Sequence, residues 1–79
     1  MSLSNSTAAW ERVRNTHTKF ADWSVNSVRT VKFLGEDHLQ LGISHRKTGQ
    51  KANAYIDAHY NLVINEEDPN DAFRRVLIA

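Results

Sequence analysis

The residues best suited to chemistry in this chain lie in one basic segment, residues 42–56, GISHRKTGQKANAYI. It carries three cations before the next acidic residue, and a tyrosine lies near its end. Cations interleaved with an aromatic ring can hold phosphates and stack on bases. One further lysine is expected on the same face of the predicted sheet. The candidate contact residues are therefore Lys32, Arg46, Lys47, Lys51 and Tyr55.

Two histidines form a second candidate cluster. Alternation along the expected strands places His38 opposite His59, with Asp57 close by. Facing imidazoles and a carboxylate are ligands for a divalent metal ion. Histidines on a solvated sheet face are common, however, and the sequence has no close-spaced ligand motif. We therefore predict no bound metal and keep His38 and His59 as candidate partner-contact residues.

The sequence shows no catalytic motif. We find no nucleophile elbow, no zinc-binding helix motif and no paired-carboxylate cleft. The stretch HRKTGQK has a single glycine, which is too few to build the nest of N–H groups that cradles a phosphate. We therefore predict that the protein is not an enzyme and has no cofactor.

Composition predicts one small globular domain over residues 1–79, with residues 1–5 as a candidate flexible tail. The chain is 41% hydrophobic and 24% charged, which is typical of a folded soluble protein. It has no cysteine, which favours a reducing compartment, and no apolar run of the length needed to span a bilayer. We expect a cytoplasmic protein without membrane contact.

The net charge of +1 hides an uneven distribution. Residues 25–51 hold five bases and two acids, whereas residues 52–71 hold five acids and no base. The molecule is therefore expected to be bipolar. Its pI of 8.2 lies below the value above about 9 that is typical of nucleic-acid-binding domains.

Helical spacing of apolar residues predicts a first helix that starts near Ser4, Ser6 or Thr7 and ends before Ser24. Its inward stripe is Trp10, Val13, His17, Phe20 and Ala21. Trp23 would lie at the end of this helix.

From Val28 the pattern alternates and predicts three strands. Odd residues point inward in the second strand (Leu39, Leu41, Ile43) and even residues in the third (Ala52, Ala54, Ile56, Ala58, Tyr60). A two- or four-residue turn at Thr48-Gly49 matches the two sets and pairs Ile43 with Ala54. Val31 and Phe33 of the first strand are expected to face inward, which requires an odd loop around Glu36. A helix over residues 51–64 is the alternative, because apolar residues there also fit helical spacing.

A second helix is expected after Asp68-Pro69-Asn70-Asp71, with Asp68 as its N-cap. The predicted fold class is α+β. It comprises a helix, a three-stranded antiparallel meander and a helix (α-β-β-β-α), with both helices on one face of the sheet and the other face open to water.

These patterns favour a small non-enzymatic binding module, such as an adaptor, an inhibitor or a regulatory subunit, of the kind that phages and plasmids encode. It would act through protein–protein contacts on the exposed sheet face, its edge strands or its charged ends, with a protein partner or a second copy in a homodimer. The alternative is a nucleic-acid-binding protein that uses Lys32, Arg46, Lys47, Lys51 and Tyr55.

Overall fold

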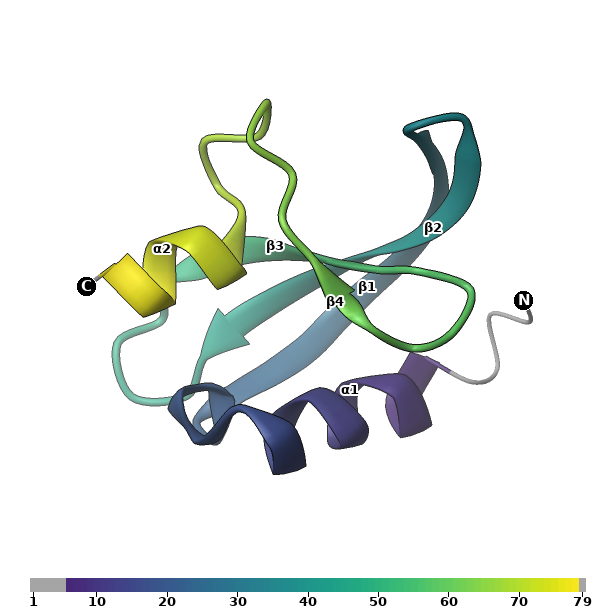
Figure 1. The fold of residues 1–79 in the computed structure, drawn as a ribbon. Helices are drawn as coiled ribbons and strands as arrows, with labels where there is room; N and C mark the ends of the chain where they lie inside the picture. Colours follow the sequence, from purple (N-terminus) through teal and green to yellow (C-terminus); the bar gives the residue numbers. More distant parts are fainter. Residues whose placement is uncertain (1–5, 79) are drawn as a thin grey trace.

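The computed structural model describes residues 6–78 and confirms an α+β fold with an antiparallel sheet (Figure 1). The sheet has four strands in the order β1-β2-β3-β4, one more than predicted. The elements are α1 (Ser6–Thr16), the 3-10 turn η2 (Thr18–Phe20), β1 (Trp23–Phe33), β2 (Glu36–His45), β3 (Lys51–Ile56), β4 (Leu62–Val63) and α2 (Ala72–Ile78). The predicted flexible tail and a helix start at Ser4 lie outside the described residues.

The first helix is shorter than predicted. It ends at Thr16, and His17 adopts an extended conformation (φ −121°, ψ 93°) before η2 begins. The run Asn15-Thr16-His17-Thr18 contains only residues of modest helix propensity, which explains why the helix stops there. Trp23 consequently begins β1 instead of ending a helix.

The hairpin of β2 and β3 confirms the predicted parity but not the predicted register. Leu41 pairs with Ala54 and Ile43 with Ala52, a shift of two residues that keeps the same side chains on the apolar face. The shift arises because the four-residue turn is centred on Lys47-Thr48, one residue before the predicted Thr48-Gly49. The backbone N–H of His45 donates to the carbonyl of Gln50 (2.8 Å), which closes this turn.

The third strand is a strand, as preferred over a helix, but it ends at Ile56. Asp57 then starts a turn, in which its Oδ1 accepts the backbone N–H groups of His59 and Asn61 (both 2.9 Å). The prediction that Ala58 continues the strand is therefore wrong.

The inward orientation predicted for Val31 and Phe33 is also wrong. A two-residue turn, Leu34-Gly35, joins β1 to β2 with positive φ at both residues (54° and 79°). The extra residue that was predicted for the loop around Glu36 lies instead within β1, at a β-bulge between Val25 and Ser27. The bulge reverses which residue numbers face inward along this strand. Phe33 therefore lies on the outer face.

The core lies between α1 and the inner face of the sheet (Figure 1). Trp10 anchors it, because its Nε1–H donates to the carbonyl of Trp23 (3.0 Å) and its ring meets Phe20 edge-on at 5.5 Å. The buried apolar residues are Ala9, Trp10, Val13, Phe20, Trp23, Leu39, Leu41, Ile43, Ala52, Ala54, Ile56 and Ala72.

The second helix lies beside β3 and contributes Ala72 to the same core. The prediction that Asp68 is the N-cap of this helix is wrong. Asp71 caps it, since Oδ1 of Asp71 accepts the backbone N–H of Arg74 (3.1 Å) and Oδ2 accepts that of Asn65 (2.7 Å). Asp71 is 1% exposed, so this carboxylate ties the preceding loop to α2 inside the protein.

Candidate functional site

The cations of the predicted binding surface lie at opposite ends of the sheet. Lys32 lies near the β1–β2 turn, far from the β2–β3 turn that carries Arg46 and Lys47 (Figure 1). There it forms an exposed ion pair with Asp37 (2.9 Å), which holds the pKa of Asp37 below its ordinary value. Lys32 is therefore not part of a surface shared with the other predicted cations.

Tyr55 is buried and cannot stack on a base. It is 4% exposed, and its hydroxyl donates to Oδ2 of Asp68 and accepts from Nε2 of Gln40 (2.8 Å). The amide of Asn53 also donates to Oδ2 of Asp68 (2.8 Å). The loop before α2 thus folds back over the outer face, which is not open in this part as predicted.

The predicted pair of His38 and His59 does not form, because β3 ends before His59. His38 is 5% exposed, and its Nδ1 bonds the carbonyl oxygen of Glu36 (3.0 Å), so this nitrogen carries the proton. His59 lies exposed in the turn after β3. Within residues 6–78, no group of three or more His, Asp or Glu side chains is placed to hold a metal ion.

Asp68 carries a testable pH dependence. Burial raises its pKa, but hydrogen bonds from Tyr55, Asn53 and the backbone of Asn70 outweigh burial and hold the pKa below 3.8. The unfolded chain therefore binds more protons in acid, so the stability from this group is present above its unfolded pKa and is lost as pH falls through the folded pKa. Burial and the bond to Asp68 raise the pKa of Tyr55 above 10.0, so its contribution is lost only in strong alkali.

We expect Asp68→Asn to lower the free energy of unfolding at neutral pH. Between about pH 5 and pH 2 the free energy of unfolding of this variant should fall less steeply than that of wild type. Urea unfolding across this range measures the slope. The matched control is Glu67→Gln, which removes the same charge from an exposed neighbour. Equal slopes for wild type and Asp68→Asn would show that other groups set the acid sensitivity.

Five cations do gather at one end of the molecule, and we call them the basic end. They come from η2, the β2–β3 turn, the start of β3 and α2, which lie together in Figure 1. The members are Lys19, Arg46, Lys47, Lys51 and Arg75. All five are exposed.

Backbone and side-chain bonds hold this end together. The N–H of Arg46 donates to the carbonyl of Asp22 (2.8 Å), and its Nε donates to Oγ of Ser24 (3.2 Å). Lys47 lies 3.7 Å from the Asp22 carboxylate. The guanidinium of Arg75 donates to the carbonyl of Lys51 (3.2 Å), which joins α2 to β3. The cations are therefore positioned by the fold and not only by flexible side chains.

A hollow of about 450 Å³ lies within the basic end. Its lining residues are Lys19, Trp23, His45, Gln50, Arg75 and Val76. The His45 ring meets Trp23 edge-on at 5.3 Å, and its Nδ1 accepts the backbone N–H groups of Lys47 and Thr48 (3.1 and 3.3 Å). Because Nδ1 is an acceptor, the neutral ring carries its proton on Nε2.

Arg46, Lys47 and Lys51 of the basic end were among the predicted contact residues, whereas Lys19 and Arg75 were not. Lys19 lies on the polar side of the first helical segment, and Arg75 follows Arg74 on the outer side of the last helix. No local pattern links them to the hairpin, because only the packing of η2 and α2 brings them there.

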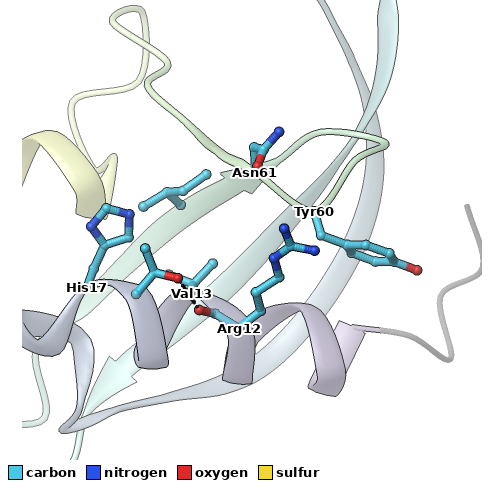
Figure 2. A pocket seen from close by; sticks show the side chains of 7 residues that line it. Arg12, Val13, His17, Tyr60 and Asn61 are labelled. Atoms are coloured by element: carbon cyan, nitrogen blue, oxygen red, sulfur yellow. Dashed lines mark hydrogen bonds between the residues drawn. The ribbon is translucent and has the colours of Figure 1, made fainter.

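A second hollow, of about 160 Å³, lies between α1 and the turn before β4. Figure 2 shows Arg12 and His17 at opposite sides of it with Val13 between them, so these two side chains do not converge on one ligand. Tyr60, at the rim, has a positive φ of 63° within the turn that Asp57 stabilises. We assign no site to this hollow.

The predicted edge-strand surface is present at β1, an outer strand of the described sheet. It carries a bulge near Asn26 and the exposed cations Arg29 and Lys32. Bulges and charges are features by which edge strands avoid pairing with another chain. The edge of β1 is therefore a weaker candidate than the basic end.

Comparisons with protein-family models, curated proteins and solved structures give no match to this chain. Within residues 6–78, no helix has the length and apolar character to cross a membrane.

Proposed function

We propose that this protein is a non-enzymatic binding module that recognises an acidic segment of a partner protein through its basic end. The observation that carries this proposal is the gathering of five exposed cations at one end of the molecule, where two of them, Lys19 and Arg75, line a hollow. Such a module suits an adaptor, an inhibitor or a regulatory subunit. Charge complementarity would guide the encounter and set the partner's orientation.

A compact acidic target fits this surface better than a nucleic acid does. The whole chain has a net charge of only +1, and the loop before α2 carries the exposed acids Glu66 and Glu67, which would repel an extended polyanion. Trp23 and Tyr55 are each 4% exposed, so neither offers a stacking platform. Nucleic-acid binding is therefore the competing outcome of the test.

We expect binding to weaken as salt is raised, because exposed ion pairs contribute only about 0.2–1 kcal/mol each and are screened. Fluorescence anisotropy with a labelled glutamate-rich peptide, compared between about 50 and 200 mM salt, measures this. The double charge reversal Arg46→Glu/Lys51→Glu should abolish peptide binding. Arg12→Glu/Arg29→Glu makes the same change in net charge outside the basic end and should leave most of the affinity.

Two results would contradict the proposal. One is no peptide binding at the lower salt concentration. The other is tighter binding of DNA or RNA oligonucleotides than of the peptide, lost in Arg46→Glu/Lys51→Glu, which would establish the nucleic-acid alternative. Homodimer formation stays a separate prediction, which light scattering on the purified protein checks.

A further inference from the structure

We infer that the hollow of the basic end accepts an apolar side chain, so that the partner segment is acidic but carries one leucine- or phenylalanine-sized anchor. This inference rests on the proposed function and names the chemistry of its partner. The cations alone would suit any compact polyanion. The hollow that Lys19 and Arg75 line adds a requirement for an apolar group at one position of the ligand.

The hollow has the size and the lining for such an anchor. Its volume of about 450 Å³ lies in the range of about 300–1,000 Å³ that is usual for ligand pockets. Of the two apolar lining residues, Val76 is half-buried and supplies most of the accessible apolar surface, whereas Trp23 is 4% exposed and offers only an edge. Lys19 and Arg75 are exposed cations of the same lining. An uncharged apolar ligand would leave these cations without a carboxylate partner, and a purely acidic one would leave the apolar surface without a contact.

The apolar wall is fixed before any partner arrives. The Trp23 carbonyl accepts the Nε1–H of Trp10, and the Trp23 backbone pairs with His45 at the end of the sheet. The edge-on contact of the two rings at 5.3 Å holds the indole against the imidazole. A preformed wall reduces the conformational entropy lost on binding, which favours a defined anchor residue over a diffuse charge contact.

Two directional donors are available to the carboxylates beside the anchor. His45 uses Nδ1 within its own turn, so its Nε2–H is the donor that this ring can offer to a ligand. Arg75 uses one N–H for the carbonyl of Lys51 and retains further donors on its guanidinium. The hollow therefore offers hydrogen-bond donors to carboxylates that neighbour the apolar side chain.

The test uses two labelled peptides with identical acidic flanks and either leucine or alanine at the centre. We expect the leucine peptide to bind about tenfold more tightly to the wild-type protein, because burial of the larger side chain adds favourable transfer free energy. Val76→Ala should reduce this preference to about threefold, since one wall of the hollow is lost. Val63→Ala, a half-buried valine of β4, is the matched control and should keep the tenfold preference.

A second variant guards against loss of α2 in Val76→Ala. Gln50→Glu places a carboxylate on an exposed residue of the lining and should weaken both peptides, whereas Thr30→Glu, exposed on β1, should not. Equal, salt-sensitive binding of the two peptides by wild type would overturn the inference and leave the proposed function intact. A leucine preference unchanged in Val76→Ala, together with unchanged affinity for both peptides in Gln50→Glu, would also overturn it. No binding of either peptide would overturn both proposals.

Discussion

Replacing Phe20 with alanine is expected to lower the free energy of unfolding by about 3–5 kcal/mol. Phe20 is fully buried (0% exposed), and its ring packs edge-on against Trp10 at 5.5 Å and against His17 at 6.3 Å. Its removal leaves a cavity where η2 meets the core. Small domains often have a free energy of unfolding of only about 5 kcal/mol, so a large fraction of the molecules should be unfolded at ambient temperature.

Urea unfolding monitored by circular dichroism measures the loss. Phe33→Ala is the matched control, because the same side chain is there only half-buried on the outer face, beside His38 at 5.3 Å. We expect a clearly smaller effect for Phe33. A loss at Phe20 no larger than that at Phe33 would show that η2 is not anchored to the core in solution.

Asp71→Ala is expected to lower the free energy of unfolding by about 2–4 kcal/mol, through loss of a helix cap and of charge-assisted hydrogen bonds. The buried carboxylate accepts the N–H groups of Asn65 and Arg74. Without it both donors lose their partner at the start of α2. The substitution should also weaken acidic-peptide binding, because α2 carries Arg75 and Val76.

The comparison variant is Asp71→Asn, which keeps one acceptor oxygen and a good N-cap residue. It should lose less stability than Asp71→Ala and keep more of the helix. Far-ultraviolet circular dichroism and urea unfolding of both variants provide the measurement. Equal losses would indicate that the negative charge, and not the cap geometry, is what Asp71 contributes.

Alternation predicted the apolar face of β2 and β3 correctly, because parity depends only on the side-chain period of a strand. It could not fix the register. A turn centred on Lys47-Thr48 gives the same parity as one centred on Thr48-Gly49, and local hydrogen bonds to His45 select the earlier position.

The alternation pattern gave the wrong orientation for the end of the first strand for a different reason. Trp23 and Val25 are odd-numbered and Val28 is even-numbered, yet all three contribute to the core. The bulge before Ser27 reverses the parity within one strand. Val31 and Phe33 therefore suggested an orientation that holds only for residues before the bulge.

The candidate site was predicted in part. Arg46, Lys47 and Lys51 are close in sequence and stay close in space, whereas Lys19 and Arg75 join them through tertiary packing. Tyr55 was assigned to an open surface because nothing in its own strand indicates that Asp68 folds back to accept its hydroxyl proton.

The α2 helix, which lies beside β3 and is joined to it through Asn53 and Asp71, supplies part of the binding surface as well as part of the core. Any ligand that fills the hollow would therefore contact α2 as it is packed against β3. A ligand that binds only when α2 is packed on β3 stabilises that packing by mass action, so affinity and local order at this end are thermodynamically linked.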